Sequence, residues 1–386
     1  MIGTLLESYI KTIVDGMTGK DLEFYQREFE FFDTVTEISS TIKPYPKGVE
    51  RREACLKALA TIKLGRFGVY LPSNPDAVVV DIKYDSGRPM QSAAKAPFLA
   101  TFKVKECKVV DMQAFDNKTA DITRGVSWKS CIFKEGDDLR QDILALQVID
   151  LCLTTIKTCG LDVYLKPYKV VATAPGSGVI ECVPDSKSRD DLGKSTDENL
   201  YDYFLYTYGD EKSIEFQNAR ENFVKSMAGY SILSYILQIK DRHNGNIMID
   251  KDGHLIHIDF GFLFESSPGG NMGFEPDIKL TTEMILIMGG SVDAAPFKRF
   301  VELCTRTFLA IRPYCEQICT LVSLMMETNF PCFRDDALRK LRFRFQPTLS
   351  DRDAAAWIKK MIRDNTKNPR TVVYDALQWY QNDLTY

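Results

Sequence analysis

The 386-residue sequence contains only three histidines, and no two of its ten cysteines form a Cys-x-x-Cys pair. Zinc sites are usually built from such pairs or from several histidines, so this composition argues against a zinc protein. Scattered cysteines are typical of reduced thiols rather than of a disulfide framework. No run of 18 apolar residues occurs, and the first residues lack the basic and apolar regions of a signal peptide. We therefore expect a cytoplasmic protein with no membrane-spanning segment.

Two common phosphate-binding motifs, the Walker A motif and the Gly-x-Gly-x-x-Gly loop, are also missing. If the protein binds a nucleotide, another segment has to meet the phosphates. The best candidate is 90–97 (MQSAAKAP), where small residues would let backbone amides approach phosphate and where Ser92 and Lys95 add donors. The net charge is −4, so the chain as a whole is not polycationic, and we expect no nucleic-acid partner.

The most specific signal lies in two polar stretches, 240–246 (KDRHNGN) and 257–261 (HIDFG). Asn246 follows Asp241 by five residues, and Asp259 follows Asn246 by thirteen. Phosphoryl transfer from ATP uses a carboxylate beside the attacking hydroxyl, together with an Asn and an Asp that hold Mg²⁺. Protein kinases have the same Asp-to-Asn spacing but place the His before the Asp. Here the order is inverted, which points away from ordinary protein kinases.

These residues suggest a general base and two magnesium ligands, and the sequence leaves open which residue is the base. Asp241 could accept the proton of the attacking hydroxyl, but so could His243, because histidine titrates near neutral pH. Asn246 and Asp259 offer oxygen ligands, which Mg²⁺ prefers. The intervening 247–258 reads as a β-hairpin around a Lys-Asp-Gly turn, which would bring both ligands to one edge.

A lysine upstream has the position expected of a phosphate ligand. Lys134 ends the apolar stretch Ile-Phe-Lys, and kinases use a strand lysine to contact ATP phosphates. Three aspartates follow it around the start of a predicted helix over 137–158, and we expect Asp142 to pair with Lys134 and orient it. Around this helix the pattern predicts strands over 78–82, 98–104, 131–134, 163–165, 169–174 and 178–183.

Taken together, the sequence resembles the PI3/PI4-kinase superfamily, and within it the catalytic region of the type III alpha phosphatidylinositol 4-kinases. The resemblance covers residues 66–386. The matching stretches are 71–75 (LPSNP), 92–97 (SAAKAP), 133–142 (FKEGDDLRQD), 171–175 (VATAP), 178–184 (GVIECVP), 240–246 (KDRHNGN), 259–271 (DFGFLFESSPGGN), 273–280 (GFEPDIKL) and 380–383 (YQND).

The resemblance implies an α+β fold of the two-lobed, protein-kinase-like type. Residues 1–65 would be the end of a helical accessory domain, 66–184 a mixed β N-lobe with the hinge, and 185–386 a mainly helical C-lobe. ATP and Mg²⁺ would be bound, with the adenine held at the hinge by the backbone of Glu181 and Val183. Family members carry a long helical region upstream, so contacts with scaffold proteins through that region would be largely absent here.

The activation segment, 259–281, bears on the substrate. It contains one basic residue, Lys279, against four acidic ones, whereas related kinases of multiply phosphorylated lipids place several cations there. We therefore expect plain phosphatidylinositol as the substrate, with Lys279 as a substrate contact. Phosphorylation at position 4 is implied by the resemblance alone.

We expect the protein to bind the cytosolic face of a membrane as a peripheral protein. The resemblance implies that this is the plasma membrane. The basic segment 334–370 has eleven Lys and Arg against five Asp and Glu, which suits an anionic surface. Two alternatives remain: a Ser/Thr protein kinase of the PI3K-like group, and a pseudokinase that only binds nucleotide or partners. All four motif residues of a working kinase are present, which argues against the pseudokinase.

Overall fold

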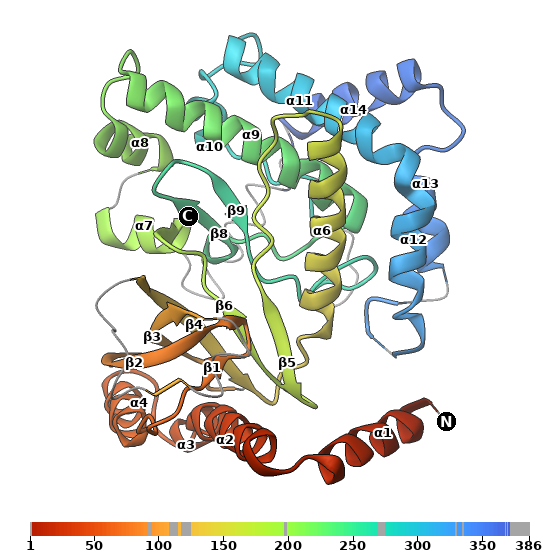
Figure 1. Cartoon of the computed structure of the whole chain (residues 1–386). Helices are drawn as coiled ribbons and strands as arrows, with labels where there is room; N and C mark the ends of the chain where they lie inside the picture. The colour runs from red at the N-terminus through yellow and green to blue at the C-terminus, as the bar shows by residue number, and fades with distance from the viewer. Residues whose placement is uncertain are drawn as a thin grey trace. The chain divides into compact units, whose positions relative to one another are not determined.

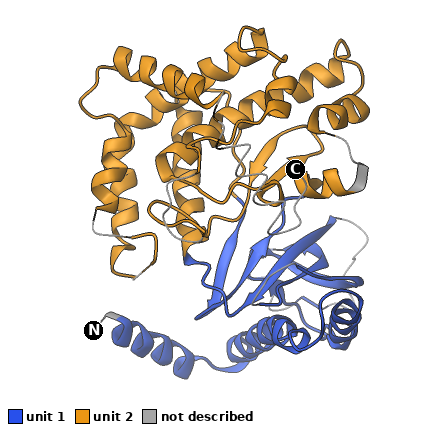
Figure 2. Ribbon diagram, turned by 180° about the vertical axis from the view of Figure 1, so that it is seen from behind, with its two compact units in different colours: residues 1–140, 168–184 blue, residues 141–167, 185–386 orange. Residues whose placement is uncertain are grey.

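The computed structural model describes residues 2–90, 95–107, 115–116, 125–196, 199–268, 275–328, 330–333, 336–366, 368 and 370. Figure 1 shows the order of the helices and strands along the chain. The chain divides into two compact units, coloured separately in Figure 2. The N unit comprises residues 1–140 and 168–184, and the C unit comprises residues 141–167 and 185–386.

The N unit is built on a six-stranded antiparallel sheet with the order β1-β2-β3-β4-β6-β5. Its strands are β1 (Tyr70–Leu71), β2 (Asn74–Pro89), β3 (Phe98–Glu106), β4 (Val126–Glu135), β5 (Val170–Ala174) and β6 (Ser177–Glu181). In β3 the side chains alternate strictly: Phe98, Ala100, Phe102 and Val104 are buried, and the residues between them are more exposed. This period of two gives the sheet one apolar face.

Four helices precede the sheet: α1 (Ile2–Gly16), α2 (Gly19–Thr36), α3 (Ile38–Ile42) and α4 (Val49–Thr61). Apolar side chains of α2, α3 and α4 form one hydrophobic core with the apolar face of the sheet. Phe31 of α2, for example, meets the Phe102 ring edge-on at 6.4 Å. Helices α2, α3 and α4 thus pack onto the sheet of the N unit, and the assignment of 1–65 to the end of an accessory domain stays a prediction.

The C unit is mainly helical. Its helices are α6 (Arg140–Thr158, which begins one residue before the unit), α7 (Arg189–Thr196), α8 (Leu200–Tyr208), α9 (Ile214–Leu237), α10 (Thr282–Ile287), α11 (Ala295–Ile311), α12 (Cys315–Ser323), α13 (Ala337–Arg344) and α14 (Asp351–Asn365), with short 3₁₀ turns η1 (Asn244–Asn246), η2 (Arg312–Tyr314) and η3 (Met326–Thr328). The central helix is α9, capped by the Ser213 hydroxyl, which accepts from the Phe216 amide. Most of its residues are buried, and α11 packs along it.

A three-stranded sheet, β7-β8-β9, adjoins the two polar stretches 240–246 and 257–261 that the sequence singled out. Strands β8 (Ile247–Asp250) and β9 (Leu255–His257) form the predicted hairpin, and β7 (Ser186–Ser188) pairs with β8. Gly253 in the turn has a φ of 87°, and a Cβ there would lie 2.9 Å from the backbone oxygen of Ala219. Glycine therefore lets the turn approach helix α9 closely.

The structure confirms the α+β class, but one predicted strand is wrong. Residues 163–165 form no strand. Val163 and Leu165 are instead buried against helix α9, where a Cβ on Gly229 would lie 2.9 Å from each of their side chains. A short apolar run has no periodicity that separates a strand from an extended segment packed on a helix.

The predicted domain boundaries stay a prediction, although the N unit and the predicted N-lobe both end at Pro184. The two divisions differ at residues 141–167, which group with the C unit and not with the sheet. None of the helices in the described part of the chain is long and apolar enough to cross a membrane.

Candidate active site

The hairpin positions the two predicted magnesium ligands. Ile247 pairs with His257 across β8 and β9, and the ladder continues with a bond from the Ile258 amide to the Asn246 carbonyl at 3.1 Å. Asp259 is the next residue along the chain, so both ligands leave the same end of the hairpin. The sequence prediction that they share one edge is confirmed.

Both aspartates of the site have left-handed backbone conformations. The φ angle is 59° at Asp241 and 61° at Asp259. Such values are uncommon for residues other than glycine and cost free energy, so they persist only where surrounding contacts enforce them. In this unit the enforcing contacts come from a few buried polar side chains.

Arg242 is one of these side chains. It is 5% exposed, and its guanidinium donates to three backbone carbonyls. Its Nε lies 2.9 Å from the carbonyl oxygen of Lys240, one terminal nitrogen lies 2.7 Å from that of Ile258, and the other donates to the carbonyl of Asp259. One planar cation thus ties the loop that follows α9 to the start of the activation segment.

The donor set fits a hard cation. The side-chain nitrogen of Asn246 donates to the Asp241 carbonyl at 2.9 Å, which leaves the amide oxygen to face a ligand. The Oδ1 of Asp259 accepts from the Gly261 amide at 3.3 Å. An amide oxygen and a carboxylate are ligands suited to Mg²⁺. Their assignment as metal ligands stays a prediction.

His243 is held in one neutral form. Its Nδ1 accepts from the Gly245 amide at 3.1 Å, and its Nε2 lies 3.9 Å from Oδ2 of Asp241. Burial lowers the pKa of His243, against the opposing effect of Asp241, so the ring is neutral at pH 7. A neutral ring that accepts at Nδ1 carries its proton on Nε2. The Nε2–H is thus the ring group on the side of Asp241, at a distance longer than a hydrogen bond.

Asp142 lies in helix α6 and reaches the Asp-Phe-Gly motif. Its carboxylate is 5% exposed and accepts from the Phe260 amide at 2.8 Å. This bond fixes the backbone immediately after Asp259. The predicted pairing of Asp142 with Lys134 stays a prediction.

In the N unit, two lysines reach the turn that follows β4. The amine of Lys134 lies 3.2 Å from the carboxylate of Asp137, and the amine of Lys95 donates to the carbonyl of Gly136. The sequence did not single out Asp137 as a partner of Lys134, although its spacing of three residues was a signal. The turn therefore gathers two cations, as a phosphate site requires.

The other predicted nucleotide contacts are less defined. Ser92 lies outside the described residues. At the predicted hinge, the Glu181 amide donates to the Lys169 carbonyl at 2.8 Å and the Cys182 amide to the Ser130 carbonyl at 2.9 Å. These two amides already donate to backbone carbonyls within the N unit. The contacts of Glu181 and Val183 with adenine stay a prediction.

Lys279 has surroundings unlike those of a substrate-facing cation. The residue is 5% exposed, and its amine donates to Oδ1 of Asn244 at 3.0 Å. Asn244 is itself 5% exposed. The amine is therefore turned into the protein, onto the loop that carries Asp241. The predicted substrate contact stays untested, and the geometry favours a structural role for this lysine.

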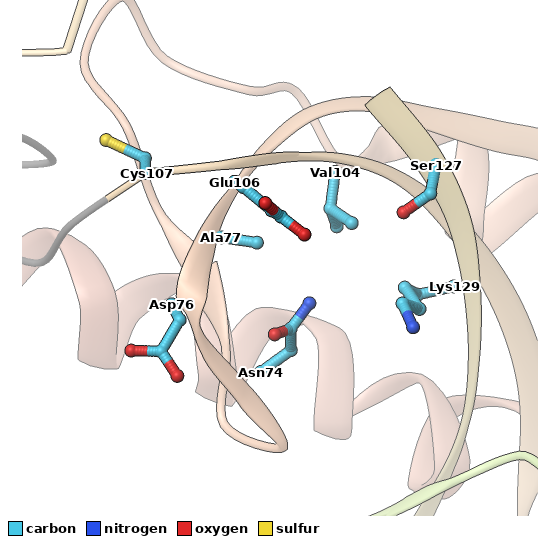
Figure 3. A pocket seen from close by; sticks show the side chains of 8 residues that line it. All are labelled: Asn74, Asp76, Ala77, Val104, Glu106, Cys107, Ser127 and Lys129. Carbon is cyan, nitrogen blue, oxygen red and sulfur yellow. The ribbon is translucent and has the colours of Figure 1, made fainter. Parts of the chain in front are cut away.

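Two other polar features are not assigned to the site. A hollow of about 590 Å³ lies in the N unit, lined mostly by polar side chains that include Glu106 and Lys129 (Figure 3). None of the predicted site residues lines it. In the C unit, Asp250, Asp252 and His254 form a possible ligand cluster, but the Asp250 carboxylate accepts from the amides of the other two residues and so caps the hairpin turn.

Comparison with known proteins agrees with this geometry. A sequence profile of phosphatidylinositol 3- and 4-kinases matches residues 128–335. A phosphatidylinositol 4-kinase alpha-like protein of Homo sapiens is 49% identical over the whole chain, which covers 71% of that protein. The chain belongs to the phosphatidylinositol 3- and 4-kinase family.

Within this family, fungal relatives match the whole chain or nearly so. Phosphatidylinositol 4-kinase stt4 of Schizosaccharomyces pombe is 45% identical over 100% of the chain. Phosphatidylinositol 4-kinase STT4 of Saccharomyces cerevisiae is 48% identical over 99%. The chain spans only 21% and 20% of the lengths of these two proteins.

Proposed function

We propose that this chain is a lipid kinase that transfers the γ-phosphoryl group of ATP to the 4-hydroxyl of phosphatidylinositol. The observation that carries the proposal is the arrangement of Asp241, Asn246 and Asp259 around one hairpin, held by buried polar contacts. The substrate and the position on the inositol ring rest on relatives that are named phosphatidylinositol 4-kinases.

In the proposed reaction the inositol hydroxyl oxygen forms a bond to the γ-phosphorus, and the bond from that phosphorus to the β,γ-bridging oxygen breaks. ADP leaves, and the hydroxyl proton passes to the Asp241 carboxylate. The His243 geometry supports this choice of base, because the lone pair on Nδ1 already accepts from the Gly245 amide. His243 would then donate to the Asp241 carboxylate or to a phosphate oxygen.

Asn246 and Asp259 would hold Mg²⁺, which neutralises the charge of the phosphates when bound. Lys134 and Lys95 would contact phosphate oxygens, together with Ser92. The backbone of Glu181 and Val183 would hold the adenine. Asp142 would keep the amide after Asp259 in place, as its bond to Phe260 supports.

The substrate resides in a membrane, so we further propose that the protein acts at a cytosolic membrane face as a peripheral enzyme. Segment 334–370, with its excess of six positive charges, is the part of the sequence that favours an anionic surface. Scaffold partners and the plasma membrane as the target are proposals that rest on the family resemblance.

The proposal is tested by offering phosphatidylinositol vesicles, phosphatidylinositol 4-phosphate vesicles and a peptide panel with ATP and Mg²⁺. Labelled lipid from the first vesicles alone is expected. Labelled peptide would instead indicate a PI3K-like protein kinase, and ATP binding without turnover would indicate a pseudokinase.

The choice of base is tested separately with two variants. Asp241→Asn should abolish transfer, whereas His243→Gln should retain measurable activity, because an amide can still donate a hydrogen bond. Equal loss in both variants would argue that His243 takes part in proton transfer.

A further inference from the structure

The end of the activation segment contacts residues 238–246, here called the catalytic loop, through every second residue. Residues 275, 277 and 279 alternate along the chain and all reach the stretch that follows helix α9. The Glu275 carboxylate accepts from the Asp241 amide at 2.7 Å, the Asp277 carboxylate accepts from the Gln238 side chain at 3.2 Å, and the Lys279 amine donates to Asn244 at 3.0 Å. These three contacts bracket the proposed base, Asp241.

The contact of Glu275 acts on the strained residue itself. Asp241 has a φ of 59°, and a backbone amide that is shielded from water needs an acceptor within the protein. A carboxylate oxygen at 2.7 Å satisfies this amide and so favours the left-handed conformation. On the other side of the same residue, the Asp241 carbonyl accepts from Asn246. Asp241 is thus held at both of its peptide groups.

The contact of Lys279 acts three residues further along the loop. Both Lys279 and Asn244 are 5% exposed, so this is a buried bond to a charged donor. Such bonds are costly to break, because the remaining partner loses its hydrogen bond in a place that water does not reach. Lys279 therefore fixes the start of the 3₁₀ turn that ends at Asn246.

We propose that Glu275 and Lys279 are positioning residues that hold the catalytic loop in its working conformation, so that the end of the activation segment determines the turnover rate. This inference rests on the proposed kinase function. It assigns Lys279 to the protein's own loop and not to the lipid headgroup.

Two variants of Glu275 distinguish the effect of the accepting oxygen from the effect of the negative charge. Glu275→Gln keeps an oxygen at the same reach but removes the charge, and Glu275→Asp keeps the charge but withdraws the oxygen by one methylene. Burial, with a further contribution from the Asp241 carboxylate, already raises the pKa of Glu275, so its surroundings do not favour the charge. We expect kcat of Glu275→Gln to stay within about threefold of wild type, and kcat of Glu275→Asp to fall by about ten- to a hundredfold at unchanged KM for ATP.

The reverse order, with the Asp variant active and the Gln variant impaired, would show that charge matters and would overturn the proposal. Wild-type kcat in both variants, or equal loss in both, would overturn it as well.

Lys279→Met tests the second contact and distinguishes positioning from substrate binding. If the lysine positions the loop, kcat falls while KM for phosphatidylinositol stays the same. If KM for the lipid rises at unchanged kcat, Lys279 contacts the substrate and the proposal fails.

A matched control comes from Glu283, a carboxylate outside the site that accepts from the Leu200 amide at 2.9 Å and pairs with Arg189. Glu283→Gln should lower the melting temperature without changing kcat. A matching fall in kcat there would mean that general destabilisation explains the Glu275 and Lys279 effects.

The proposed lipid substrate and the loop-positioning role can fail independently. If the wild-type protein labels no lipid, the proposed function is wrong. The rate at which the protein hydrolyses ATP with water is then measured for the same variants. Glu275→Gln should again be faster than Glu275→Asp.

Discussion

Replacing Arg242 with lysine should damage both the stability and the turnover of this protein. Arg242 donates to the carbonyls of Lys240, Ile258 and Asp259 from three nitrogens of one rigid plane. A lysine amine keeps the positive charge, but its compact head can meet about one of these carbonyls. The variant therefore loses two bonds from a charged donor and leaves two carbonyls in a buried place without that donor.

The magnitude follows from this count. Bonds to charged groups contribute about 1.5–3 kcal/mol each, so Arg242→Lys should lower the free energy of unfolding by about 3–6 kcal/mol. That is a large part of the roughly 5–15 kcal/mol that stabilises a typical domain. The carbonyls of Ile258 and Asp259 are two of the three acceptors, so the lost bonds loosen the backbone that positions Asp259. We therefore expect kcat to fall by about a hundredfold as well. Thermal unfolding and steady-state kinetics on the same preparation measure both effects.

Arg312 provides the control. It also donates to three backbone carbonyls, those of Phe345, Gln346 and Leu349, but it lies outside the catalytic loop and the activation segment. Arg312→Lys should therefore lower the melting temperature and leave kcat unchanged at temperatures where the protein is folded. The reasoning is refuted if Arg242→Lys has wild-type stability and kcat, or if the two variants lose turnover equally.

Three further outcomes are expected. Asp259→Ala should lower kcat by about 10²–10³-fold or more while the protein stays folded, because the change removes a proposed magnesium ligand; near-normal activity in a folded variant would reject that assignment. Lys134→Met should remove activity and weaken ATP binding with little change in melting temperature, since methionine keeps an unbranched apolar stem and the lost ion pair is to a carboxylate that is 46% exposed; wild-type ATP affinity would mean that another residue holds the phosphates. Burial lowers the pKa of His257 well below its ordinary value of 6.5, with Arg242 and Lys279 adding to the shift, so the unfolded chain binds more protons below that pH. The free energy of unfolding should then fall by up to about 1.4 kcal/mol per unit as the pH drops below about 6.5, and His257→Phe, which keeps a ring beside Tyr230, should have a shallower slope; identical slopes would contradict this account.

The parts of the site that sequence reasoning could find are those set by local spacing. The hairpin between Asn246 and Asp259 follows from a turn signal flanked by apolar residues, and the structure has that hairpin. The lysine at the end of β4 was likewise visible, because one strand determines its position.

The contacts that hold the site together join segments far apart along the chain, so no local spacing predicts them. Glu275 lies 34 residues from Asp241 along the chain, and Asp142 lies 118 residues from Phe260. The burial of Lys279 could not be read from its neighbours in sequence either, because a single cation in an acidic segment is compatible with either a substrate contact or an internal bond. Likewise, the apolar residues 163–165 pair with no strand because helix α9 offers them an apolar surface.

The proposed function rests on the transfer of phosphate to one hydroxyl of phosphatidylinositol. The most direct test is to incubate the protein with γ-labelled ATP, Mg²⁺ and phosphatidylinositol vesicles, then to separate the labelled lipids by the position of the phosphate on the inositol ring. Phosphatidylinositol 4-phosphate is the expected labelled product, and it should be absent with Asp241→Asn. Label at another position of the ring, or lipid labelling that persists in Asp241→Asn, would refute the proposed reaction.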